Sequence, residues 1–379
     1  MNNVSTEVTE KPAINFFEKY LTVWVLLCMA AGMLIGKFLP SVADRLESYQ
    51  VLNTNIPIAV LTWVMIFPMM MKIDFKSILN VRKTYQGIMI SSITSWLIKP
   101  FLMFGLASFF FYVVFSNFIP ADLAKDYVAG AVLLGAAPCT AMVFVWSNLT
   151  KGDPAHTLVQ VSINDLLIIV LFVPIVSFLL GVNNVFVPWN ILFASVLLFV
   201  LVPLVGGALT RYFMIKRKGI DYFNNRFLPK FDSITTIGLL LTLVIIFTYQ
   251  GDIILNNPFH VLMIAVPLVL QNIITANFAY FTCKWTKQPH NVAAPAALIG
   301  ASDFFELSVA VAITLFGVNS PVVLVTTVGV LTEVPVMLLL VKLINGTKDG
   351  SRQKEKMNEK NLFLMYGQFL SKPNSGRIC

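Results

Sequence analysis

A cysteine beside a proline is the first feature of this sequence that could do chemistry. Pro138, Cys139 and Thr140 lie in the apolar stretch GAAPCTAMVFVW, residues 135–146. Proline cannot donate a backbone hydrogen bond and disfavours helix in the residue before it, so we predict a broken helix at this point. Sulfur is a soft ligand that binds thiophilic species in preference to hard, oxygen-seeking ions. One thiol provides a single, reversible attachment, and these three residues are therefore a candidate binding site.

A second stretch combines small residues with acids. In IGASDFFELSV, residues 299–309, Asp303 and Glu306 stand where a helix facing lipid would carry Leu or Val. Leaving an ionisable group in hydrocarbon costs at least about 2.5 kcal/mol on insertion scales, so such groups are functional candidates by default. A carboxyl group beside a water-filled cavity can take up and release a proton, and we assign proton coupling to Glu306. Asp303 lies about one helical turn away and is expected to tune it.

Three further ionisable side chains lie within apolar runs, namely Lys99, Asp165 and Glu333. Functional and structural roles are equally open for Asp165 and Glu333, which we keep as supporting candidates. Lys99 precedes Pro100, and its long side chain is expected to extend toward the cytoplasmic surface, which favours a structural role.

The composition is that of an integral membrane protein. Of the 379 residues, 57% are hydrophobic and 12% are charged, and the mean hydropathy is +0.78. Apolar runs of roughly 20 residues recur along the chain, each long enough to cross the hydrocarbon as a helix. They predict an all-α fold with about ten transmembrane helices. The predicted spans are 20–39, 55–71, 86–115, 128–146, 158–180, 188–210, 234–250, 259–283, 293–316 and 320–343.

The Lys and Arg residues indicate the orientation of these spans. If the N-terminus is cytoplasmic, 23 of the 27 fall in cytoplasmic segments. The positive-inside rule therefore places both termini in the cytoplasm of a multi-pass protein of the cell membrane. The charge is spread over loops, so the basic pI of about 9.2 indicates membrane topology and no nucleic-acid partner.

The spans divide into two sets of five. Because five is odd, two such repeats would have opposite orientations, and inverted repeats place a substrate site near the bilayer midplane on discontinuous helices. The breaks in the fourth and ninth spans fit this rule. An acid follows each break at a similar distance, with Asp165 26 residues after Cys139 and Glu333 27 residues after Glu306. We assign a cytoplasmic tail to 1–19, the first repeat to 20–180, an external connector to 181–187, the second repeat to 188–345 and a cytoplasmic tail to 346–379.

Other classes of site receive little support from the sequence. The four cysteines, at positions 28, 139, 283 and 379, show no paired spacing, so no disulfide framework is predicted. We expect no cofactor and no resident metal ion. The apolar run near residue 20 has no small-residue cleavage pattern after it, so we expect it to stay as a span.

Four segments resemble the arsenical-resistance-3 family of arsenite efflux carriers, within the bile acid/sodium symporter superfamily. They are GAAPCTAMVFVWSNLTKGDPAHTLVQVSINDL (135–166), KYLTVWVLLC (19–28), IPIAVLTWVMIFPMMMKIDF (56–75) and IGASDFFELSVAVAI (299–313). The resemblance implies ten spans in two inverted repeats, extrusion of trivalent arsenic and sometimes antimonite, and energy from inward proton movement. The essential cysteine of the family falls on Cys139, and its essential glutamate falls on Glu306.

The chain departs from the family pattern in places. Asp303 stands where the family usually has Asn, and Pro138 stands where some members have Arg. Two neighbouring carboxylates seldom ionise together, so Asp303 is expected to alter the coupling of Glu306.

These features predict a secondary transporter, not an enzyme, that exchanges cytoplasmic arsenite for external protons. Arsenite would bind the Cys139 sulfur and leave on the outside after the bundle of one repeat rocks against the other. A sodium-coupled organic-anion symporter of the same superfamily is the alternative, with Asp303, Glu306 and Asp165 as cation ligands. A membrane metalloid or redox sensor that uses Cys139 is a further alternative. The oligomeric state stays open.

Overall fold

The structure is a computed structural model that describes residues 21–51, 54–73, 85–140 and 142–370. In these ranges the chain is helical apart from short connections and one small hairpin, in which β1 (Gln50–Val51) pairs antiparallel with β2 (Thr54–Asn55). Helices satisfy every backbone hydrogen bond within one segment, which is what a chain in hydrocarbon requires. The prediction of an all-α membrane protein is confirmed. The predicted tail 1–19 lies outside the described residues.

Six of the described helices are long and apolar enough to cross a membrane. They are Tyr85–Val114, Pro154–Val182, Trp189–Lys218, Ile220–Gly251, Pro258–Trp285 and Pro321–Thr347. Shorter apolar helices cover Val23–Phe38, Ile56–Lys72 and Phe305–Phe316. Each predicted span overlaps one of these helices or, for the spans 128–146 and 293–316, a pair of shorter helices with a break between them.

The first half of the described chain begins with α2 (Leu21–Phe38), α3 (Pro40–Ser48) and α4 (Ile56–Lys72). A continuous helix follows, composed of α6 (Tyr85–Ile93), η1 (Thr94–Ile98), α7 (Lys99–Phe109) and η2 (Phe110–Val114). Next come α8 (Ala121–Gly135), α9 (Val143–Leu149), α10 (Pro154–Leu167), η3 (Ile168–Phe172) and α11 (Val173–Val182). Asp153 caps α10 by accepting a 2.8 Å hydrogen bond from the Ala155 N–H, with Pro154 at the first helical position.

The second half of the described chain also consists mainly of long helices. It contains α12 (Trp189–Val196), η4 (Leu197–Leu201), α13 (Val202–Lys218), α14 (Ile220–Tyr222), η5 (Phe223–Phe227) and α15 (Pro229–Asn256). It ends with α16 (Pro258–Trp285), α17 (His290–Ala301), α18 (Phe305–Phe316) and α19 (Pro321–Leu370).

Prolines account for most of the widened turns in these helices. Four of the five described π-helical turns, η1, η3, η4 and η5, end two residues before a proline. A proline ring clashes with the carbonyl four residues earlier and cannot donate to it, and a wider turn relieves both problems. The prolines in question are Pro100, Pro174, Pro203 and Pro229. The helix therefore continues through these prolines instead of breaking.

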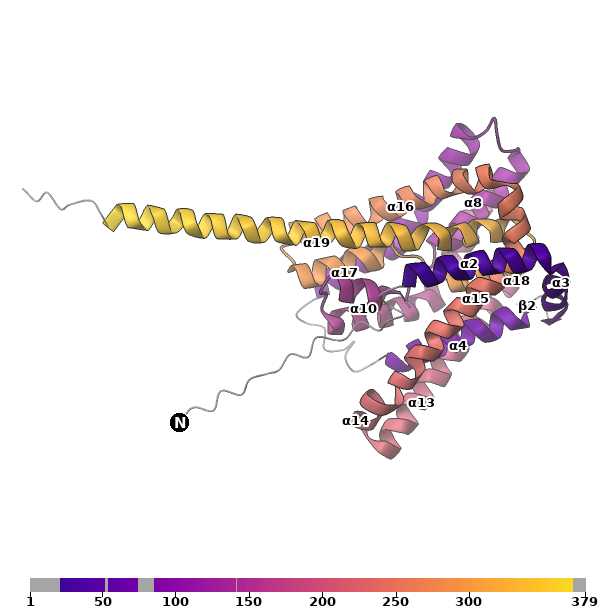
Figure 1. Cartoon of the computed structure of the whole chain (residues 1–379), viewed down its shortest axis with the longest axis horizontal. Coiled ribbons are helices and arrows are strands. Elements are labelled where there is room, and N and C mark those ends of the chain that lie inside the picture. Colours follow the sequence, from indigo (N-terminus) through magenta and orange to yellow (C-terminus); the bar gives the residue numbers. More distant parts are fainter. Residues whose placement is uncertain (1–20, 52–53, 74–84, 141, 371–379) are drawn as a thin grey trace, which may run out of the picture.

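The helices pack into two bundles that meet at α18. In one bundle α2, α4, α13 and α15 lie against one another, and in the other α7, α8, α16, α17 and α19 do so (Figure 1). The short helix α18 contacts α4 and α12 as well as α8 and α19. Each bundle draws helices from both sides of the connector 181–187, so the packing units are not the two sequence halves. A rocking motion of one bundle against the other would therefore not be a motion of one repeat against the other.

Two segments that the sequence assigned to loop or tail are helical. The segment 211–233, between the predicted spans 188–210 and 234–250, consists of the end of α13, then α14, η5 and the start of α15. The α13 helix ends at Lys218, after a last turn that contains three basic residues and so suits the helix dipole. Gly219 follows as its cap, with a φ of +82° that favours glycine. The helix α19 continues through the predicted tail to Leu370 and extends beyond the bundles (Figure 1).

Candidate functional site

The first break separates α8 from α9. The helix α8 ends at Gly135, and α9 begins only at Val143. Pro138 lies within this interval, as the sequence predicts, because it removes one backbone donor and disfavours a helical residue before it. The second half-helix does not start directly after Pro138, because the chain around Pro138 is extended and pairs with another segment.

That other segment is the second break, between α17 and α18. The helix α17 ends at Ala301 and α18 starts at Phe305, so the predicted discontinuity of the ninth span is confirmed. The two breaks form an antiparallel bridge in which Pro138 faces Asp303. The Cys139 N–H donates to the Ser302 carbonyl at 3.2 Å, and the Phe304 N–H donates to the Ala137 carbonyl at 2.8 Å. Each break thus satisfies backbone groups that the other has freed, which hydrocarbon demands.

Lys99 lies at the centre of this crossing. Its ammonium nitrogen Nζ is 2.9 Å from Asp303 Oδ1, and it donates to the Ser302 carbonyl at 2.9 Å and to the Ala137 carbonyl at 3.2 Å. The side chain is completely buried. The prediction that Lys99 extends toward the cytoplasmic surface is therefore wrong. Carbonyls freed by both breaks, together with a buried carboxylate, supply the acceptors that an ammonium group otherwise finds in water.

The carboxyl group of Glu333 on α19 also reaches the crossing. Its Oε1 accepts a 3.0 Å hydrogen bond from the Asp303 N–H and a short hydrogen bond from the Ser302 hydroxyl. With its amide oriented to suit its neighbours, Asn272 of α16 donates to the Ala301 carbonyl at 3.0 Å and to Asp303 Oδ2 at 3.3 Å. The second break is thus held by side chains from α7, α16 and α19.

This geometry changes the expected relation between Asp303 and Glu306. The two acids were predicted to lie one turn apart on a helix, with Asp303 tuning Glu306 directly. Asp303 instead lies in the extended break, and its carboxylate pairs with Lys99. Glu306 lies in the first turn of α18, beyond the break.

The Cys139 thiol lies among polar groups of the second break. It is fully buried and interacts with the Ser302 side chain and with the backbone N–H of Met142. It is also within electrostatic range of the Glu333 and Glu306 carboxyl groups. The structure thus brings the predicted sulfur and two of the predicted acids into one cluster.

Several buried oxygens of the candidate residues lack a hydrogen-bond partner among the described residues. These are both carboxyl oxygens of Glu306, Oε2 of Glu333 and the hydroxyl of Thr140. Both carboxyl oxygens of Asp165 also lack one, although its neighbour Asn164 accepts a 3.2 Å hydrogen bond from the Trp96 indole. Asp165 is buried on α10, and the described contacts do not join it to the crossing.

Sequence reasoning missed three members of the cluster: Lys99, Ser302 and Asn272. The position of Lys99 offered a signal, because it falls in the middle of the helix Tyr85–Val114, far from either end. A lysine at that depth needs acceptors inside the protein. Ser302 and Asn272 carry no comparable signal, since polar residues of this kind also serve ordinary contacts between membrane helices.

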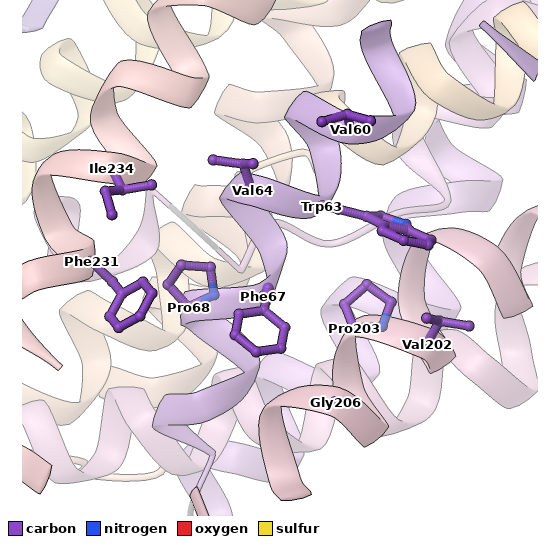
Figure 2. A pocket seen from close by; sticks show the side chains of 10 residues that line it. All are labelled: Val60, Trp63, Val64, Phe67, Pro68, Val202, Pro203, Gly206, Phe231 and Ile234. Atoms are coloured by element: carbon purple, nitrogen blue, oxygen red, sulfur yellow. The ribbon is translucent and has the colours of Figure 1, made fainter. Parts of the chain in front are cut away.

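The crossing is closed in this conformation. Cys139 and Thr140 are 0% exposed, Glu306 is 1% exposed and Asp303 is 2% exposed, so the predicted water-filled cavity is not open. A separate cavity of about 440 Å³ lies between α4, α13 and α15 (Figure 2). Its lining is apolar and includes Phe67, Pro68, Val202 and Phe231, and the Trp63 indole N–H at its edge donates to the Leu198 carbonyl. This cavity offers nothing to a polar substrate.

Comparison with known proteins places the chain in a family. The profile of the Sodium Bile acid symporter family matches residues 58–257. The arsenical-resistance protein Acr3 of Alkaliphilus metalliredigens is 58% identical over 341 residues, which cover 90% of this chain and 96% of the relative. An uncharacterized transporter of Synechocystis sp. is 42% identical over 88% of this chain and 90% of its own. The arsenical-resistance protein Acr3 of Corynebacterium glutamicum is 32% identical over 89% and 91%. The chain therefore belongs to the Sodium Bile acid symporter family and, within it, to the arsenical-resistance-3 family of membrane transporters.

Proposed function

We propose that this protein extrudes arsenite from the cytoplasm in exchange for protons and so confers resistance to arsenic. The observation that carries the proposal is the position of the Cys139 thiol, buried where two broken helices cross, with Glu306 and Glu333 in electrostatic range. Two relatives are arsenical-resistance proteins, which supports arsenic as the cargo. Antimonite, which is also thiophilic, would be a second cargo.

The binding step is an exchange of ligands on arsenic. Arsenous acid arrives as a neutral trihydroxide, the Cys139 sulfur forms a bond to arsenic, and one arsenic–oxygen bond breaks. The thiol proton leaves with the departing hydroxide as water, so no net charge is created. The Ser302 and Thr140 hydroxyls and the extended backbone at Pro138 would line the place of the remaining two hydroxyl groups. With one sulfur ligand the attachment reverses readily, which release on the far side requires.

Proton coupling falls to the acids that have free acceptor atoms. Both oxygens of Glu306 and one oxygen of Glu333 lack a hydrogen-bond partner among the described residues, so they are available to a proton. Asp303 is a poor candidate for this task because its carboxylate is engaged by Lys99 and Asn272. A proton from outside would bind after arsenite has left and would reset the carrier. Coupling requires that the two facing conformations differ in affinity for each ligand.

The closed crossing supports an alternating-access cycle. Because Cys139 is fully buried, arsenite reaches it only after the two bundles move apart at α18. We infer that the bundle of α2, α4, α13 and α15 moves against the other, opening the crossing to one side at a time. The paired breaks are consistent with two inverted five-span repeats at 20–180 and 188–345. The distribution of Lys and Arg supports a cytoplasmic position for both termini of a cell-membrane protein.

Everted membrane vesicles test the proposal. Arsenite uptake should appear when the vesicle lumen is made acidic, and it should collapse when a protonophore removes the pH gradient. Sodium in place of the pH gradient should give no uptake. Sodium-driven transport of an organic anion that resists thiol alkylation would favour the symporter alternative and overturn the proposal. Arsenite binding without vesicle uptake would indicate a sensor.

A further inference from the structure

We propose that the crossing is a binding site for a monovalent cation and that the Lys99 ammonium group is its permanent, covalently held occupant. The site consists of the Ala137 carbonyl, the Ser302 carbonyl and the Asp303 carboxylate, all of which contact Lys99 Nζ at 3.2 Å or less. This cation site is distinct from the sulfur of Cys139. Its predicted effect on arsenite transport rests on the proposed function, whereas its predicted effect on cation binding does not.

The ligands identify the class of cation. All three are oxygen atoms, two of them backbone carbonyls at the ends of broken helices, and unwound carbonyls of this kind coordinate Na⁺ in other transporters. Hard cations prefer such oxygen donors, and a thiol does not compete for them. An ammonium group carries the same single positive charge as an alkali cation. Lys99 therefore neutralises the carboxylate and binds the carbonyl oxygens as a free alkali cation would otherwise do.

The position of Lys99 fixes the charge of the crossing. A free cation would enter and leave in each transport cycle and would couple transport to its own gradient. Lys99 cannot leave, because its side chain extends from the middle of the helix Tyr85–Val114. The Asp303 charge is therefore neutralised in every conformation that keeps this ion pair. Protons on Glu306 and Glu333 are then the coupling ions left to this site.

Removal of the ammonium group should vacate the site. In Lys99→Met the side chain keeps its bulk but loses its charge, so two carbonyls and the Asp303 carboxylate are left without a cation in a buried place. A buried carboxylate without a counterion is strongly unfavourable. The variant should therefore take up Na⁺ from solution, whereas Lys99→Met combined with Asp303→Asn should not, because its carboxylate charge is gone.

Thermal unfolding of purified protein tests this directly, without arsenite. The native protein, Lys99→Met and the double variant are compared in sodium chloride and in choline chloride at equal ionic strength. Sodium should raise the unfolding midpoint of Lys99→Met by several degrees and leave the other two proteins unchanged. Radioactive sodium should likewise bind to Lys99→Met and not to the native protein or the double variant. Equal midpoints for Lys99→Met in the two salts, or sodium bound by the native protein, would overturn the proposal.

Vesicle transport provides the second readout. Native arsenite uptake should be the same in sodium and in choline, while Lys99→Met should be inactive in choline and partly restored by sodium. If native uptake fails altogether, the proposed function is at fault and the thermal result still decides the cation site. If Lys99→Met folds in neither salt while the double variant folds, the site does not accept free sodium and the proposal fails. If neither variant folds, arsenite uptake by the native protein in sodium and in choline is the deciding measurement. Faster native uptake in sodium would overturn the proposal.

Discussion

The two breaks of this transporter differ in how tightly the protein holds them. The first break runs from the end of α8 at Gly135 to the start of α9 at Val143, contains a proline, and carries the Cys139 thiol. The second break separates Ala301 from Phe305 and contains no proline. Glu333 and Asn272 from two other helices bind the second break, and Lys99 bridges it to the first. Thr140 of the first break has a hydroxyl without a partner among the described residues.

This difference indicates that the two breaks have different roles. The first break presents polar atoms that are free to bind a substrate, and the second is a fixed frame against which the first is positioned. Backbone in hydrocarbon tolerates a break only where protein or water satisfies it. Side chains satisfy the polar groups of the second break, so its geometry does not need a ligand. The first break keeps polar atoms that can still bind a ligand.

The largest effect is expected from Cys139→Ser. Serine keeps the size and polarity of the side chain but replaces a soft ligand with a hard one. Arsenite uptake into everted vesicles should fall at least about 100-fold, equivalent to about 2.7 kcal/mol, at equal expression. The matched control is Cys28→Ser on α2, outside the crossing, which should transport normally. Equal losses in the two variants would remove the special role of the first break.

A smaller loss with a different signature is expected from Glu306→Gln. The amide keeps the shape of the side chain but cannot carry a proton, so accumulation driven by a pH gradient should fall by about tenfold, which is about 1.4 kcal/mol. Exchange of labelled for unlabelled arsenite without a gradient should continue. Loss of both activities would mean that Glu306 belongs to the binding site and not to the coupling step.

The frame role of the second break predicts a stability effect from Glu333→Leu. This change leaves the Asp303 N–H and the Ser302 hydroxyl without their acceptor, and each unsatisfied buried group costs about 1–3 kcal/mol. The unfolding midpoint in detergent should drop clearly. Glu333→Gln keeps an acceptor oxygen and should unfold near the native temperature. A Leu variant as stable as the native protein would show that the second break is not held by Glu333.

The smallest effect is expected from Asp165→Asn. Asp165 follows the first break in sequence much as Glu333 follows the second, yet the described contacts do not link it to the crossing. The isosteric change removes no described hydrogen bond, so transport should change by less than about twofold. A loss as large as that of Glu306→Gln would show that the two halves are more alike than their contacts suggest.

Local chemistry explains what could be predicted from sequence. Hydrophobic length predicted the membrane helices, and Pro138 predicted the first break because it has no backbone donor and disfavours helix in the residue before it. Proline alone is a weak guide, since Pro68, Pro267 and Pro335 lie inside continuous helices. What distinguishes Pro138 is the extended partner around Asp303, which lies far away in the sequence.

Contacts between distant segments explain what could not be predicted. Lys99 was expected to reach the surface because it precedes Pro100 and has a long side chain, but its three acceptors come from both breaks. Asp303 was paired with Glu306 from spacing along a helix that the structure interrupts between them. The α19 helix is a different kind of miss. The run after residue 345 is polar and was predicted to be a tail, yet it continues the helix to Leu370.

X-ray absorption at arsenic in purified protein loaded with arsenite tests the central claim most directly. One sulfur and two oxygen neighbours should surround arsenic in the native protein, and oxygen neighbours alone should remain in Cys139→Ser. Sulfur that persists around arsenic in Cys139→Ser, or an all-oxygen shell in the native protein, would contradict the assignment of the buried thiol at the crossing as the arsenite ligand.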